Sequence, residues 1–207
     1  MKDFYNRFEV LASCKNEIEE TAELLIKMYE NGGKLLICGN GGSCADSDHI
    51  VGELMKGFML KRRDKGALLE KLQKCGFDDA SFIAENVQMG LPAISICTHS
   101  GLISAYANDE KSELVYAQQV IGYGKENDTL LALSTSGNSK NVVYAAKVAK
   151  ALGLRVIAIT GSKESKLSEM SDVCIRVPET ETFKIQELTL PTYHYLCQRL
   201  EYHFFGE

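Results

Sequence analysis

The chain of 207 residues is 45% hydrophobic and 25% charged, a balance typical of a globular protein with a buried core. Its formal net charge of −5 leaves no general basic surface, so we expect it to bind neither nucleic acid nor an anionic membrane. The first residues lack the apolar segment of a signal peptide, and no apolar run reaches transmembrane length. The seven cysteines include no Cys-x-x-Cys pair, which favours buried free thiols in a reducing compartment and a cytoplasmic location.

The first half of the chain predicts helices around one short strand. Residues 3–31 have apolar positions at helical spacing and end at two glycines, which predicts one long helix. A strand at 34–38 and a helix at 43–56 follow. Residues 59–91 are less regular: a charge run at 61–65, which we expect to be exposed, precedes short helices at 66–74 and 79–88. We interpret 59–91 as a helical excursion before the next strand, not as a separate domain.

The remaining sequence alternates strands with helices. Strands are predicted at 93–97, 129–133, 155–160 and 173–177, and helices at 100–107, 111–122, 139–151, 165–170 and 182–205. The last helix contains Pro191, where a kink is expected. The alternation, with continuously apolar strands, predicts an α/β fold: a doubly wound five-stranded parallel sheet flanked by helices, with long N- and C-terminal helices. Ligands of such folds bind beyond the carboxyl ends of the strands.

Two loops at such strand ends predict a phosphate site. Gly39-Asn40-Gly41-Gly42-Ser43 follows the first strand, and Ser134-Thr135-Ser136-Gly137-Asn138-Ser139 follows the third. Each leads into a helix, whose first N–H groups and dipole attract anions, and the hydroxyls of the second loop can donate to phosphate oxygens. The first loop lacks the third glycine of a dinucleotide fingerprint, and no P-loop motif is present. The pair of loops therefore indicates a small phosphorylated molecule.

Four further side chains suggest proton transfer or metal binding. His49 and Glu53 are four residues apart on one predicted helix, and Gln186 and His194 are eight apart on another, so each pair shares a helix face. The set offers nitrogen and oxygen ligands for a divalent metal, or a base and an acid. From spacing alone, a His/Glu pair on a helix is more often a surface pair.

Several short stretches together carry a family resemblance. They are Cys38–Ser43, Asp46-x-x-His49-x-x-x-Glu53-Leu54, Ala107-Asn108-Asp109, Leu133–Val142, Ile159-Thr160-Gly161, Val177-Pro178, and Ile185-Gln186-Glu187 with His194. Through them the chain resembles the sugar isomerase (SIS) domain superfamily and, within it, the phosphoheptose isomerase family. The resemblance covers nearly the whole chain apart from about 59–91.

This resemblance implies a single SIS domain over 1–207 with a flavodoxin-like fold. It also implies an aldose–ketose isomerase of a sugar phosphate, commonly a homotetramer with its sites at subunit contacts. Glu53 and His194 would move the protons, and zinc would be held by His49, Glu53, Gln186 and His194. The substrate would be bound by Asn40, Gly41, Gly42, Ser43, Asn108, Asp109 and Gln186 around the sugar, and by Ser134, Thr135, Ser136 and Ser139 at the phosphate.

Two departures from the family pattern concern the substrate more than the reaction. The family commonly has Gly-Arg-Phe where this chain has Lys56-Gly57-Phe58, and the segment 59–91 is longer than usual. The leading prediction is conversion of sedoheptulose 7-phosphate to glycero-manno-heptose 7-phosphate through an enediolate. The alternatives are an isomerase of another sugar phosphate, and a non-catalytic SIS protein that binds a partner of the replication-initiator type.

Overall fold

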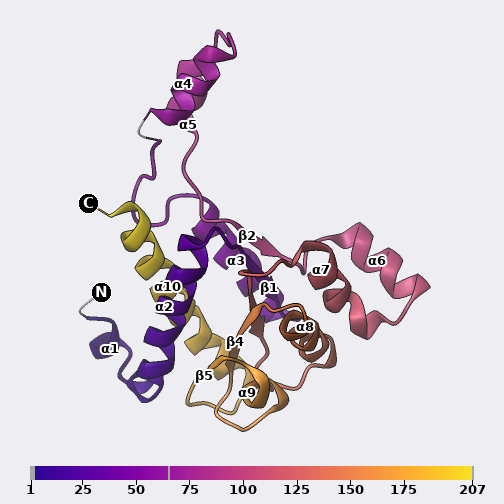
Figure 1. Ribbon diagram of the computed structural model, residues 1–207. Helices are drawn as coiled ribbons and strands as arrows, with labels where there is room; N and C mark the ends of the chain where they lie inside the picture. Colours follow the sequence, from indigo (N-terminus) through magenta and orange to yellow (C-terminus); the bar gives the residue numbers. More distant parts are fainter. Residues whose placement is uncertain (1–2, 65, 207) are drawn as a thin grey trace.

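A computed structural model describes residues 3–64 and 66–206, and within them five strands form one parallel sheet (Figure 1). The strands are β1 (Leu35–Cys38), β2 (Ala93–Ser95), β3 (Thr129–Leu133), β4 (Arg155–Thr160) and β5 (Val173–Arg176). Their order is β2-β1-β3-β4-β5, and all neighbouring pairs are parallel. The predicted α/β fold with a five-stranded parallel sheet is thus confirmed.

Helices cover both faces of this sheet. Side chains that alternate along each strand enter two different cores, as Ile37 and Leu36 of β1 do. Against one face pack α2 (Lys15–Glu30), α3 (Gly42–Met55) and α10 (Thr182–Phe205). Against the other pack α7 (Val115–Tyr123), α8 (Lys140–Ala151) and α9 (Lys166–Met170). Both faces are covered, so β1 and β3 are buried along their whole length and, apart from Thr129, apolar.

The strand order reverses between β1 and β3, and the two small-residue loops meet there. Cys38 at the end of β1 pairs in register with Ala132 of β3, so the loops begin side by side. The amides of Asn40 and Asn141 then bond each other in both directions, at 2.9 and 2.8 Å. The Tyr116 hydroxyl adds a bond to the Gly39 carbonyl at 2.8 Å. Both loops therefore lie at the strand-order reversal, the place where ligands of such folds bind.

The N-terminal region differs from the predicted single helix over 3–31. It forms α1 (Phe4–Arg7), a 3₁₀ segment η1 (Glu9–Cys14) and then α2. Phe8 interrupts the helix with φ −123° and ψ 63°. The Phe4 ring stacks on Tyr195 of α10 with centroids 4.3 Å apart, and this long-range contact outweighs the local helical pattern. The predicted helix at 111–122 likewise begins with a 3₁₀ turn, η2 (Ser112–Leu114), before α7.

Within 59–91 the structure has two short helices, α4 (Ala67–Lys74) and α5 (Ala80–Asn86), which project from the body as a hairpin (Figure 1). In the described part of the hairpin, α4 buries none of its side chains, and Phe82 is 70% exposed. The charge run that precedes it was expected to be exposed. That is correct for Lys61 and Arg63 but wrong for Arg62, which is 2% exposed. Lys65 of this run lies outside the described residues.

Three other predictions have simple outcomes. Helix α10 continues through Pro191 to Phe205, and the predicted kink stays a prediction. All seven cysteines are free thiols in the structure, but the expectation that they are buried holds only for Cys14, Cys38 and Cys197. Among the helices of the described residues, none has both the length and the apolar character needed to cross a membrane.

Candidate active site

Helices α3 and α10 bring together three of the predicted ligands. His49 and Glu53 come from α3 and His194 from α10, and one ligand atom from each lies within 4.8 Å of the others. The two helices run in the same direction, because Gln186 of α10 faces Gly42 and Tyr193 faces His49. The sequence left open whether His49 and Glu53 form only a surface pair or belong to a functional site. His194, which lies 145 residues after His49 in the chain, joins them here, and this favours a functional site.

The arrangement of these three side chains fits a divalent cation. His49 Nε2 lies 3.1 Å from Glu53 Oε1. Glu53 Oε2 and His194 Nε2 are buried and have no hydrogen-bond partner among the described residues. A buried polar atom without a partner is costly, so a group that accepts both lone pairs would stabilise the cluster. Imidazole nitrogen and carboxylate oxygen are ligands that zinc commonly takes.

A hydrogen-bonded chain behind His49 orients its ring. The Tyr193 hydroxyl donates to Asp46 Oδ1 at 3.3 Å and lies 2.9 Å from His49 Nδ1. With a metal bound, the Tyr193 oxygen would accept the Nδ1 proton of His49, which would leave the Nε2 lone pair for the metal. Burial, together with Asp46, raises the pKa of Tyr193, so the hydroxyl keeps its proton. The sequence analysis gave neither residue a role, although Asp46 stands one turn before His49 in a stretch that carries the family resemblance and Tyr193 adjoins His194.

The electrostatic setting favours a neutral His194. Burial lowers the pKa of His194, the nearby His49 lowers it further, and Glu53 acts in the opposite direction. A neutral imidazole keeps a lone pair that can bind a metal or take a proton. Lys56, part of the departure from the family pattern, places its ammonium 3.6 Å from Glu53 Oε2. A cation thus lies beside the carboxylate despite the missing arginine.

The Ser/Thr loop lies beside a small polar pocket. Gly137 has φ +63°, and a Cβ there would collide with Ser165, so this position requires glycine. Ser134 Oγ donates to Ser139 Oγ at 3.1 Å, the N-cap Ser139 makes no side-chain cap bond, and Asn141 Oδ1 accepts the Val142 N–H in the first turn of α8. A pocket of about 250 Å³ adjoins the loop. Its lining includes hydroxyl, ammonium and carboxylate groups, from Thr135, Ser136, Thr182, Lys163, Glu164 and Glu179.

The glycine loop after β1 starts α3 and contacts Gln186. Gly41 has φ +54° at the N-cap, where no side chain caps the helix. The absent side chain of Gly42 leaves the space that the Gln186 amide occupies. Ser43 is buried, and Asn40 is engaged with Asn141.

Three predicted site residues lie apart from the ligand cluster in this structure. Gln186 contacts Gly42, which is seven residues, or about 10 Å of helix, before His49. Its place as a fourth zinc ligand stays a prediction. Asn108 and Asp109 are exposed at the end of α6 (Ser100–Asp109), where their side chains bond each other at 2.8 Å. Their contact with the sugar also stays a prediction.

Known proteins resemble the chain over almost its whole length. Two sequence models of the SIS domain match it, one over residues 102–199 and the other over residues 3–73. A phosphoheptose isomerase of Helicobacter pylori (strain P12) is 37% identical over 194 residues, which are 94% of this chain and 88% of that protein.

Solved structures of phosphoheptose isomerases also resemble this chain. A phosphoheptose isomerase from Francisella tularensis has 28% identity and a TM-score of 0.73 over 96% of each chain. One from Neisseria gonorrhoeae has 30% identity and a TM-score of 0.70 over 97% of each chain. Sequence and fold lead to the same conclusion: the chain belongs to the phosphoheptose isomerase family of SIS-domain proteins.

Proposed function

We propose that this protein is an aldose–ketose isomerase that converts sedoheptulose 7-phosphate to glycero-manno-heptose 7-phosphate. The convergence of Glu53 and His194, with His49 beside them, is the observation that carries the proposal. The names of its relatives supply the substrate. A heptulose 7-phosphate has its carbonyl and its phosphate at opposite ends. That suits a site whose proton-transfer groups and anion loop are separate.

The chemistry needs two proton movements, and we assign them to Glu53 and His194. Glu53 takes the proton from C1 of the ketose, which gives an enediolate, and returns a proton to C2 to form the aldose. The neutral His194 carries the hydroxyl proton between O1 and O2, so the new carbonyl forms at C1. Glu53 Oε1 lies 3.1 Å from His49 Nε2, and Oε2, which is 3.6 Å from the Lys56 ammonium, accepts no hydrogen bond among the described residues and can take a proton.

The remaining residues bind and orient the substrate. Ser134, Thr135, Ser136 and Ser139 hold the phosphate at the start of α8, and this remote binding energy orients the reacting carbons. Asn40, Gly41, Gly42, Ser43 and Gln186 line the sugar, with Asn108 and Asp109. Zinc held by His49, Glu53, His194 and Gln186 would stabilise negative charge on the two substrate oxygens.

The test is an NMR assay with sedoheptulose 7-phosphate in D₂O. We expect the seven-carbon aldose phosphate to appear with deuterium at C2, and Glu53→Gln to abolish both conversion and exchange. Gln is nearly isosteric with Glu, so the variant should fold. If the unaltered protein binds sedoheptulose 7-phosphate but does not convert it, the proposed reaction is contradicted. That result would favour another sugar as substrate, or a binding role.

We also propose a homotetramer with sites at subunit contacts. An apolar hollow of about 600 Å³ beside His194 supports this, because exposed apolar surface commonly marks an interface. Its lining includes Phe8, Phe58, Met59 and Leu190. Light scattering on purified protein should give four times the chain mass, and a monomer at micromolar concentration would refute the assembly.

A further inference from the structure

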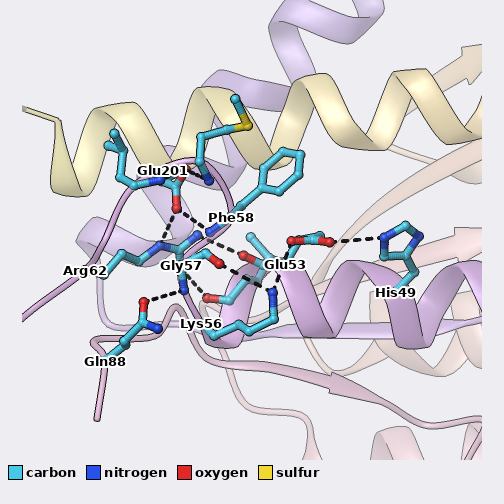
Figure 2. A network of polar contacts seen from close by, with 11 residues as sticks. His49, Glu53, Lys56, Gly57, Phe58, Arg62, Gln88 and Glu201 are labelled. Atoms are coloured by element: carbon cyan, nitrogen blue, oxygen red, sulfur yellow. Dashed lines mark hydrogen bonds and ion pairs between the residues drawn. The ribbon is translucent and has the colours of Figure 1, made fainter. Parts of the chain in front are cut away.

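A buried ion pair lies directly behind the proposed catalytic carboxylate (Figure 2). It joins Arg62, at the base of the projecting hairpin, to Glu201 near the end of α10, with Nε 2.8 Å from Oε1. Both side chains are 0% exposed. Removing two charges from water is expensive, and such a pair contributes little net stability by itself. Its geometry, more than its strength, is therefore the feature to explain.

The remaining nitrogens of Arg62 bind the helix that carries Glu53. Nη2 donates to the backbone carbonyl of Glu53 at 2.8 Å, and Nη1 donates to that of Leu54. The last carbonyls of a helix have no partner within it, and their end of the dipole attracts a cation. Arg62 thus satisfies the end of α3 from outside the helix, at the residue whose side chain enters the cluster.

Glu201 holds the arginine in place and is itself fully engaged. Its carboxylate accepts the N–H groups of Phe58, Met59 and Leu60 at 2.7, 2.7 and 3.1 Å. Burial by itself raises the pKa of Glu201, but these N–H groups and the Arg62 guanidinium outweigh it and keep the pKa below its ordinary value. The Phe58 ring lies 5.4 Å from that of His194, so the same network reaches the second proton-transfer residue.

We propose that Arg62 is a positioning residue for the isomerase reaction. Its planar fork ties the last turn of α3 to α10 and so sets the Glu53 carboxylate relative to His194, while Glu201 positions the fork. This inference rests on the proposed function. A displacement of about 1 Å at a reacting group can cost about 100-fold in rate, so a contact of this kind matters without touching substrate.

The first test variant is Arg62→Lys. It keeps the charge that Glu201 needs, but a single ammonium cannot serve a carboxylate and two carbonyls in a planar fork. We expect kcat to fall about 10- to 100-fold. The KM for sedoheptulose 7-phosphate should stay within about twofold, because the phosphate loop is untouched.

A second variant tests the pair in another way. Arg62→Met combined with Glu201→Gln deletes both charges together, and the amide oxygen of Gln still accepts N–H groups from residues 58–60. The same loss in kcat is expected, with a cooperative thermal unfolding transition that shows the variant to be folded. Lys34→Met is the control, because Lys34 pairs with the buried Asp128 near the opposite, amino-terminal ends of the strands. It should lower the melting temperature and leave kcat unchanged.

A metal titration separates this inference from the proposed function. Competition of each variant with a chelator for Zn²⁺ reads the position of Glu53 without any turnover. Affinity should fall about tenfold or more in Arg62→Lys and stay unchanged in Lys34→Met. If the unaltered protein fails to turn over, the proposed function fails, and the titration still decides the positioning role. Wild-type kcat and Zn²⁺ affinity in Arg62→Lys, or equal losses in Lys34→Met, would overturn it.

Discussion

The Tyr193 hydroxyl orients one of the predicted metal ligands, His49. It links Asp46 to the Nδ1 atom of His49 and is 1% exposed. We predict that Tyr193→Phe weakens Zn²⁺ binding by about 10- to 100-fold, as loss of other outer contacts to metal ligands does. Chelator competition measures this. Tyr29→Phe, which removes a hydroxyl bonded to the Pro92 carbonyl and to no member of the cluster, is the control and should bind Zn²⁺ normally.

Ser136 tests the proposed phosphate site in the Ser/Thr loop at the same scale. Its Oγ accepts the Asn138 N–H at 3.2 Å, which leaves the hydroxyl hydrogen for a ligand oxygen. Ser136→Ala should weaken binding of sedoheptulose 7-phosphate by about 5- to 10-fold through the loss of one donor. Calorimetry on the Glu53→Gln background measures this without turnover. Unchanged affinity would refute the assignment of this loop.

Glu19 connects residue chemistry to acid stability. Burial raises its pKa, but the hydroxyls of Tyr195 and Tyr5 and the charge of Arg199 outweigh burial and lower it. A lowered folded pKa stabilises the protein above the unfolded value of about 4.3, and this contribution is lost as pH falls through the folded pKa. Urea unfolding should therefore show wild type more stable than Glu19→Gln at pH 7, with the difference shrinking towards pH 3. An equal difference at both pH values would contradict the argument.

At the scale of elements, the hairpin of α4 and α5 is separable from the body. The fold holds its base through Arg62, and the N–H of Met89 donates to the Arg62 carbonyl at 2.7 Å. Because α4 packs no side chain into the described core, replacing residues 66–86 by a short Gly-Ser linker should shift the melting temperature by less than about 3 °C. A larger loss in thermal unfolding would show that the hairpin supports the body.

Gly137 allows a second test at the scale of elements, because it determines the backbone path of the Ser/Thr loop. Gly137→Ala introduces a Cβ against Ser165 at φ +63°. We expect a loss of about 1–3 kcal/mol in the free energy of unfolding and weaker phosphate binding. Gly153→Ala, also at positive φ but with open space around it, separates backbone strain from the collision and should cost less.

At the scale of the whole molecule, the sequence determined the α/β class, the five strands and the two loops at the carboxyl ends of β1 and β3. These features follow from local patterns: continuous apolar runs, glycines at helix ends, and small residues between strand and helix. The pairing of His49 with Glu53 on one helix face was predictable for the same reason, because helical spacing alone determines it.

Only the tertiary structure decided the features that depend on contacts between distant segments. The break at Phe8 results from the stacking of Phe4 on Tyr195, and the burial of Arg62 from Glu201, 139 residues away along the chain. The position of Tyr193 behind His49 depends on the packing of α10 along α3. A local sequence pattern gives no information about a contact partner so far away along the chain. A charge run that is usually solvated can therefore contain the one arginine that the fold buries among the described residues.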